Sequence, residues 1–247
     1  MWFKVNKLSL NVGKTNHMIF KHTNDNIDHQ IIIDGVHVDR VHVTKFLGVK
    51  VDEHLTWDDQ INSVCRNLSK NMSVLYRVKH LLNNDCMKSL YCTLILPYLN
   101  YACEIWGNTF ETRLINLIVL QKRAIRLVDK ANYREHSEPL FAKYNCLKFC
   151  DIVNFKTLII TYQAEFNLLP KNLQKMFKKS MYVHNYNTRS CTKGNFEVKF
   201  CRTKTRSMAI SVKGVKLWND LNMEYRNITS LQNFKKSIKK MYVSDYN

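Results

Sequence analysis

The spacing of apolar positions changes near residue 56. Before that point, short runs such as "IIIDGVHV" (31–38) and "KFLGVKVD" (45–52) are rich in β-branched residues, which is typical of strands. Asp34-Gly35 lies between two such runs and predicts a tight hairpin turn. Gly48 is expected to let a backbone or a ligand approach the second run closely. Residues 1–55 are therefore expected to form a small antiparallel β-structure.

After residue 56 the apolar residues recur at helical spacing. Thr56, with Asp59 three residues later, predicts the start of a helix whose apolar stripe continues to Leu82. Asn83-Asn84-Asp85 is expected to end this helix and to start a second one, which Pro97 should kink or end. Further helices are expected at residues 111–130, from 137, at 146–169 and at 230–242, with a short element at 211–221.

These patterns predict an α+β fold that is mostly α. A small antiparallel β part is followed by a helical bundle and by a basic, partly irregular C-terminal region. Residues 171–206 are polar, basic and poorly periodic, so we expect a long loop or linker there. The expected division of the chain is into residues 1–55, 56–130, 131–170, 171–206 and 207–247.

The charge is concentrated near the C-terminal end. The chain has 247 residues and a formal net charge of +18, and residues 171–247 contain 17 Lys and Arg against 4 Asp and Glu. This excess suggests a polyanionic partner, with nucleic acid ahead of a membrane surface, although a solvated basic face is the alternative. We expect no secretory leader and no membrane-spanning stretch, and the sequence contains no Cys-x-x-Cys pair. We therefore expect an intracellular protein, cytoplasmic or nuclear, that is not secreted.

Motifs for metal or nucleotide chemistry are weak. Gly13-Lys14-Thr15 matches the end of a phosphate-binding P-loop, but Leu8 stands where the first glycine is needed, and a strand rather than a helix should follow. The single Asp-Asp pair, Asp58-Asp59, lies at a predicted helix start, where acidic side chains favour the helix N-terminus. The spacing of a zinc site is not met by His184, Cys191 and Cys201. No metal site is expected.

Several longer stretches resemble one family in the correct order. "NKLSLNVGKTNHMIF" (6–20) resembles the palm segment that follows the catalytic aspartates of a reverse transcriptase, and "KFLGVKVDEHLTW" (45–57) resembles the primer grip and the start of the thumb. "LYCTLILPYLNYACEIWGNT" (90–109) and "LQKRAIRLV" (120–128) resemble the thumb. The tail is matched by "HNYNTRS" (184–190), Arg202-Thr203, "LWNDL" (217–221) and "LQNFKKSIKK" (231–240). The chain thus resembles the C-terminal part of a jockey-like non-LTR retrotransposon reverse transcriptase, an RNA-directed DNA polymerase.

The resemblance implies roles for residues of the palm and the thumb. Lys14 would lie close to the incoming triphosphate and neutralise the leaving pyrophosphate, whereas the alternative is a surface lysine at a strand start. The primer grip would be formed by Phe46, Leu47 and Gly48. A basic helix face along the phosphates would consist of Lys122, Arg123 and Arg126, with a solvated helix face as the alternative.

The C-terminal region offers a second set of candidates. Binding of RNA or DNA by charge and stacking would involve Arg189, Arg202, Lys204 and Arg206, interleaved with Tyr182, Tyr186 and Phe200. A flexible basic linker is the alternative. Packing rather than stacking on nucleic acid is expected of Trp57, Trp106, Trp218, Tyr98 and Tyr101.

The carboxylates of the polymerase reaction decide the functional expectation. Reverse transcription uses two metal ions held by a Phe/Tyr-Ala-Asp-Asp hairpin and an earlier strand, and the sequence contains neither motif. We therefore expect a truncated reverse transcriptase that is inactive alone, with Mg²⁺ needed only by the intact enzyme. Its expected partner is RNA or DNA, bound without sequence preference and in a salt-sensitive manner, and exposed strand edges are expected to allow self-association. The alternative is a non-catalytic helical module for nucleic-acid binding or protein assembly.

Overall fold

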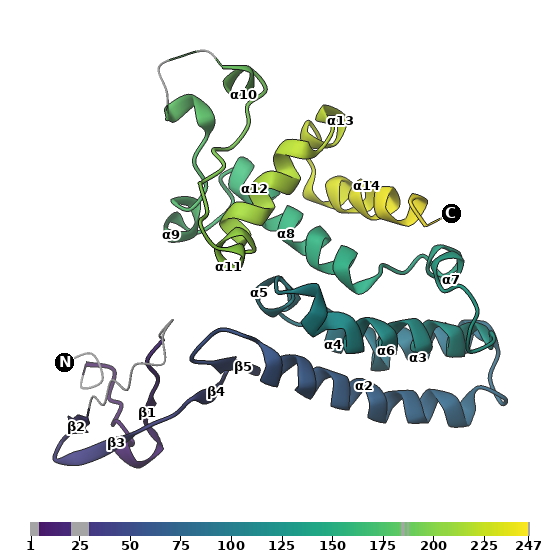
Figure 1. Cartoon of the computed structure of the whole chain (residues 1–247), viewed down its shortest axis with the longest axis horizontal. Coiled ribbons are helices and arrows are strands. Elements are labelled where there is room, and N and C mark those ends of the chain that lie inside the picture. The colour runs from purple at the N-terminus through teal and green to yellow at the C-terminus, as the bar shows by residue number, and fades with distance from the viewer. Residues whose placement is uncertain (1–4, 21–29, 184–185, 187, 247) are drawn as a thin grey trace. The chain divides into compact units, whose positions relative to one another are not determined.

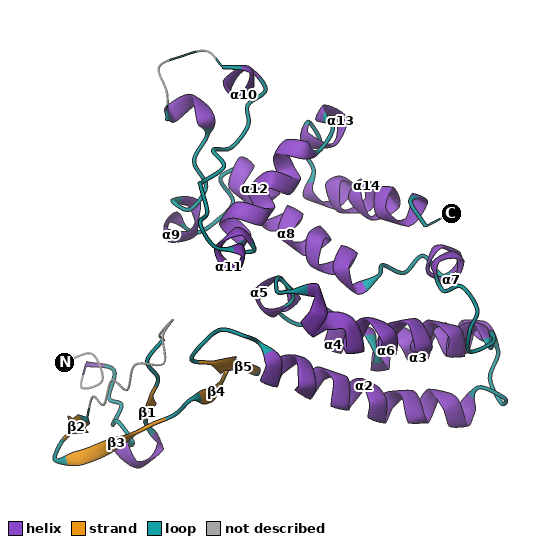
Figure 2. Cartoon of the chain, viewed as in Figure 1, coloured by secondary structure: helices purple, strands orange, loops and turns teal. Residues whose placement is uncertain are grey.

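The computed structural model describes residues 5–20, 30–183, 186 and 188–246. It comprises two compact units, residues 1–62 and residues 63–247 (Figure 1). Helices dominate over strands (Figure 2), so the predicted α+β, mostly α fold is confirmed. No helix within these described ranges is long and apolar enough to cross a membrane.

The first unit contains two small sheets. One has the strand order β1-β3-β2, and the other is the hairpin β4-β5. β2 and β3 pair antiparallel through the turn at Asp34 and Gly35, which have φ angles of 50° and 76°, so the predicted hairpin is confirmed. β1 pairs with β3 in parallel, which the sequence did not predict. The elements are the 3₁₀-helix η1 (Val12–Lys14), β1 (Asn16–His17), β2 (Ile31–Ile33), β3 (Val36–Arg40), β4 (Val43–Phe46) and β5 (Val49–Asp52).

The stretch 45–52 is not the single strand that its composition predicted. It contributes to two antiparallel strands, and Phe46 pairs with Val49 across a two-residue turn. Leu47 and Gly48 form this turn with φ angles of 46° and 83°. Gly48 therefore supplies a left-handed turn conformation. The turn was missed because leucine rarely adopts a positive φ, which costs about 1–2 kcal/mol.

A buried carboxylate organises the connection from β5 to the first long helix, α2 (Asp58–Val78). Asp52 accepts hydrogen bonds from the backbone N–H groups of His54, Thr56 and Trp57, at 3.1, 2.9 and 2.8 Å. Burial alone would raise the pKa of Asp52, but these hydrogen bonds outweigh burial and lower the pKa. Because Asp52 fixes this turn, α2 begins at Asp58, two residues beyond the Thr56 cap that the sequence predicted.

The second unit is a helical assembly. The predicted effect of Pro97 is confirmed, because one helix ends at Leu94 and the next helix carries the proline in its first turn. The long helices that follow α2 are α3 (Asn84–Leu94), α6 (Glu111–Asp129), α8 (Phe149–Glu165), α12 (Ile210–Asp220) and α14 (Leu231–Ser244). The shorter ones are α4 (Leu96–Asn100), α5 (Cys103–Trp106), α7 (Glu138–Lys143), α9 (Lys171–Gln174), η2 (Ser180–Tyr182), α10 (Arg189–Thr192), α11 (Lys204–Ser207) and α13 (Met223–Arg226).

Helix α8 lies at the centre of the C-terminal core, with α12 and α14 packed beside it (Figure 1). The Tyr162 ring lies 4.4 Å from the Phe234 ring and 6.3 Å from the Trp218 ring, measured between centroids. Trp106 and Trp218 are fully buried, as expected, and Trp57 is half-buried. The expectation of packing is wrong for Tyr101, which follows the last residue of α4 and is 55% exposed, and Tyr98 is 37% exposed.

Candidate nucleic-acid interface

A basic groove of about 650 Å³ lies in the second unit, between the C-terminal half of α2 and the C-terminal half of α6. We call it the α2–α6 groove. Its lining includes the apolar side chains of Met72, Leu120 and Leu127. Its charged and aromatic lining consists of Tyr76, Arg77, Lys79, Arg123, Arg126 and Tyr133. Among the residues that the structure describes, none that lines the groove is acidic.

The amphipathic pattern of the two helices creates this groove. α2 buries Leu68 and Leu75, and α6 buries Ala124, Ile125 and Val128, so the basic positions of each helix lie away from the core. α6 ends where Lys130 adopts a left-handed conformation with φ of 58°. This residue reverses the chain direction, and the loop that follows brings Tyr133 back against α6.

The groove is lined by four cations, Arg77, Lys79, Arg123 and Arg126. Neutral groups hold the last three in place. The Arg123 guanidinium donates a hydrogen bond of 2.8 Å to the Tyr133 hydroxyl and lies 5.4 Å from the centroid of the same ring. Arg126 Nε donates to the backbone carbonyl oxygen of Glu135 at 2.6 Å. Lys79 Nζ lies 4.5 Å from the centroid of the Tyr76 ring. Neutral partners orient these side chains without cancelling their charge, which therefore remains available to an anion.

The groove contains two of the three cations that the sequence assigned to the thumb face. Arg123 and Arg126 line it, whereas Lys122 does not. Lys122 acts on Glu138, whose pKa is lowered mainly by a hydrogen bond from Lys148 and also by the charge of Lys122. A role for Lys122 in binding stays a prediction.

Sequence reasoning missed four residues of the groove. Tyr76 and Arg77 lie in the last turn of α2, Lys79 follows the last residue of α2, and Tyr133 lies in the loop after α6. The α2 residues are far from Arg123 in the sequence, so the sequence did not show that they share a groove with it. The signal that was available is the Tyr-Arg pair at 76–77, which stands on the polar side of an otherwise clear helical stripe.

The candidates from the palm-like segment lie in the first unit. Lys14 is exposed at the end of η1, and its N–H donates to the Asn11 carbonyl oxygen at 3.1 Å. A strand follows it instead of a helix, as expected, so this is not a P-loop. Phe46 and Leu47 are exposed at the β4-β5 turn beside Gly48. Their roles in triphosphate contact and primer grip stay predictions.

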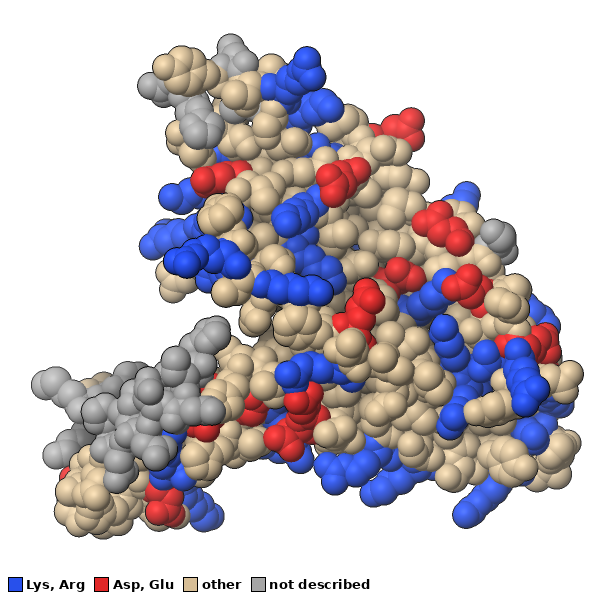
Figure 3. Space-filling view, viewed as in Figure 1, with Lys and Arg blue, Asp and Glu red and all other residues tan. Residues whose placement is uncertain are grey.

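The C-terminal candidates are spread over a surface rather than gathered in a pocket. Lys and Arg side chains cluster over the α9–α11 region on the face shown in Figure 3. Lys204 Nζ lies 5.5 Å from the Phe110 ring centroid, and Phe200 is 91% exposed. The remaining predicted residues of this set are also exposed, namely Tyr182, Tyr186, Arg189, Arg202 and Arg206.

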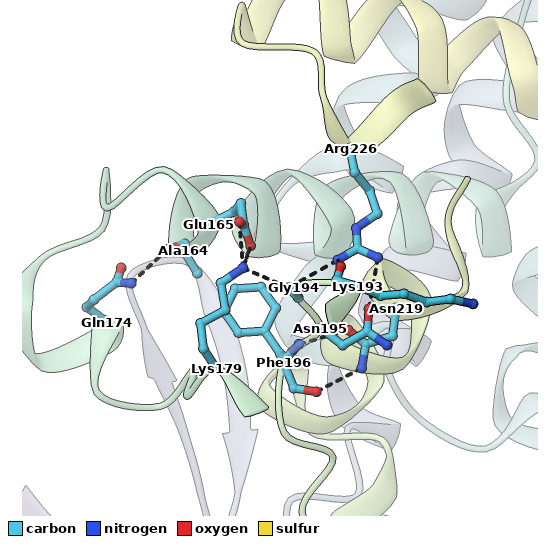
Figure 4. A network of polar contacts seen from close by, with 10 residues as sticks. All are labelled: Ala164, Glu165, Gln174, Lys179, Lys193, Gly194, Asn195, Phe196, Asn219 and Arg226. Atoms are coloured by element: carbon cyan, nitrogen blue, oxygen red, sulfur yellow. Dashed lines mark hydrogen bonds and ion pairs between the residues drawn. The ribbon is translucent and has the colours of Figure 1, made fainter. Parts of the chain in front are cut away.

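Two cations of the C-terminal region have a structural role instead (Figure 4). Arg226 is 7% exposed and donates to the Asn195 side-chain oxygen at 2.9 Å and to the backbone carbonyl oxygens of Lys193 and Gly194. Lys179 pairs with the Glu165 carboxylate and donates to the Gly194 carbonyl oxygen at 2.9 Å. These bonds fasten part of the 171–206 segment to the helical core. Neither cation is therefore available for phosphate contacts.

The structure also places the acidic and zinc-like candidates. Asp58 and Asp59 lie in the first turn of α2, where their charge favours the helix N-terminus as expected. Within the described part of the chain, no group of three or more His, Cys, Asp or Glu side chains is arranged to hold a metal ion. His184 and the Cys191 side chain lie outside the described residues, and the third member of that set, Cys201, is half-buried.

Comparison with known proteins identifies relatives of one class. The chain is 24% identical over 132 residues to the probable RNA-directed DNA polymerase from transposon X-element of Drosophila melanogaster, which covers 51% of this chain and 14% of the relative. It is 30% identical over 128 residues to the RNA-directed DNA polymerase from mobile element jockey of Drosophila funebris, which covers 50% of this chain and 14% of the relative. No protein-family profile and no solved structure matches the chain.

These relatives are RNA-directed DNA polymerases from mobile elements and probable RNA-directed DNA polymerases from transposons. More narrowly, they include the polymerases of jockey mobile elements, so the resemblance that the sequence motifs indicated is confirmed. The matched segments span 12 to 15% of the length of these relatives.

Proposed function

We propose that this chain is a nucleic-acid-binding region of a jockey-like non-LTR retrotransposon reverse transcriptase, made of the end of the palm and the thumb. The observation that carries the proposal is the α2–α6 groove, in a chain related to RNA-directed DNA polymerases. Within the described part of the chain, this groove is lined by four cations and by no acidic residue. Phosphates of RNA or DNA neutralise such cations whatever the base sequence. We therefore infer binding that tolerates any sequence and weakens with salt.

Binding is tested by gel retardation or fluorescence anisotropy with RNA and DNA oligonucleotides of mixed sequence. We expect dissociation constants on the order of 10⁻⁴ to 10⁻⁶ M at physiological salt, which is typical of non-specific phosphate contacts. Affinity should rise as the salt concentration falls. An affinity that does not change with salt would contradict binding led by phosphate contacts.

We further propose that these 247 residues do not polymerise DNA by themselves. Polymerisation by two metal ions needs carboxylates aimed at one site, and the one Asp-Asp pair of the sequence starts α2. Mg²⁺ would then be needed only by the intact enzyme, which contains those carboxylates. The purified chain with primer–template, nucleotides and Mg²⁺ should give no extension. Template-dependent extension that is lost on chelation would overturn this part of the proposal.

A second candidate function, protein assembly, is favoured by the first unit. β2 is an outer strand of its sheet, and Ile32 on β2 and Val36 on β3 are both well exposed. An outer strand with exposed apolar side chains can pair with a strand of another chain. Size-exclusion chromatography with light scattering should then show concentration-dependent self-association that Ile32→Lys reduces. A monomer at all concentrations would exclude this assembly by the chain itself.

A further inference from the structure

The tyrosines of the α2–α6 groove carry a further inference, which rests on the proposed function. We propose that this groove binds unpaired nucleotides, whose bases stack on Tyr76 and Tyr133 while the surrounding cations hold the phosphates. The ligand class is single-stranded RNA or DNA rather than duplex.

The two rings are exposed where a base can reach them. Tyr76 is 60% exposed and Tyr133 is 68% exposed, and both line the same groove. Each ring has a cation at cation–π distance, Lys79 at 4.5 Å and Arg123 at 5.4 Å from the ring centroids. A nucleotide carries its phosphate close to its base. When the phosphate binds either cation, the base can therefore reach the exposed ring beside that cation.

The apolar part of the groove lining favours a flat apolar ligand. Met72, Leu120 and Leu127 line the groove and are half-buried, and a base that covers them removes apolar surface from water. A duplex presents phosphates and sugars on its outside and keeps its bases stacked within, so it cannot fill an apolar hollow in this way. The volume of about 650 Å³ is within the range of roughly 300–1,000 Å³ that is usual for sites of organic ligands.

The charges of the groove are not cancelled by nearby carboxylates. Asp129, at the end of α6, is engaged by Lys143 and by the Tyr144 hydroxyl. The Glu135 carboxylate accepts the Asn132 N–H at 3.2 Å. Within the described ranges, none of the four groove cations forms an ion pair. An incoming phosphate therefore has no carboxylate to displace.

The test measures the affinity of the full chain for a labelled 12-nucleotide single strand and for the duplex of the same sequence, by fluorescence anisotropy at constant salt. We expect the single strand to bind more tightly. In the variant Tyr76→Ala/Tyr133→Ala, single-strand affinity should fall by about 5- to 150-fold for each base that loses its stacking partner, with little change for duplex. The salt dependence should be unchanged because no cation is removed.

Two controls separate stacking from other effects. Tyr76→Phe/Tyr133→Phe keeps both rings and removes only the hydroxyls, including the one that accepts from Arg123, so it should bind the single strand nearly as the unmodified chain does. Tyr101→Ala removes an exposed ring outside the groove, 55% exposed against 60% for Tyr76, and should have no effect.

The possible failures are distinguishable. Equal or tighter binding of duplex, with the alanine variant unaffected, would overturn the inference and leave the proposed function standing. Tyrosine-independent binding of a 12-residue poly-glutamate peptide, as tight as that of the single strand, would also overturn it, because charge alone would then suffice. Absence of binding to either nucleic acid at low salt would overturn the inference and the proposed function together.

Discussion

Replacing Arg77 and Arg126 by glutamine removes two of the four cations that line the α2–α6 groove. For a single strand, the slope of log affinity against log salt is about −0.7 per neutralised phosphate, so four contacts give a slope of about −2.8 and two give about −1.4. Between about 50 and 200 mM salt, the affinity of the unmodified chain should then fall roughly 50-fold and that of the variant roughly sevenfold.

The assay is anisotropy titration of one labelled oligonucleotide at several salt concentrations, with thermal unfolding to confirm that the variant is folded. Lys235→Gln/Lys236→Gln is the matched control, since it removes the same charge from exposed positions on α14. The control should keep the slope of the unmodified chain. An unchanged slope in the Arg77/Arg126 variant, or an equal reduction in the control, would refute the assignment of phosphate contacts to this groove.

Two further predictions concern stability. A Cβ atom added at Gly214 would lie 2.5 Å from Thr161 Oγ1 on α8, so Gly214→Ala should destabilise the second unit by about 1–3 kcal/mol in chemical denaturation, despite the better helix propensity of alanine. Combining it with Thr161→Ala should cost less than the sum of the two single changes, and strict additivity would argue against this contact. Asp52→Asn should destabilise the first unit by about 2 kcal/mol near neutral pH, because the carboxylate accepts three backbone N–H groups. Since the folded pKa of Asp52 is lowered, this stabilisation is complete above the unfolded pKa of about 4 and is lost as the pH falls towards the folded value, so unfolding curves of the variant and the unmodified chain should converge in acid.

The sequence by itself determined the features that depend on local chemistry. The Asp34-Gly35 turn, the break at Pro97 and the long helices followed from residues close together in the chain, because turn conformations and helical periodicity are local properties. The kinship with transposon polymerases is likewise a property of the sequence, since the family-like motifs follow one another in the correct order along the chain.

Tertiary structure alone decided which residues share a site and which cations are free to act in it. Tyr76 and Tyr133 meet in one groove only because α2 and α6 pack into one unit and the chain reverses at Lys130. Composition could not distinguish Arg226, which is buried in a network of carbonyl and amide oxygens, from an exposed arginine such as Arg206. Burial and distance between remote segments arise from the packing of the whole chain, and a one-dimensional pattern does not contain them.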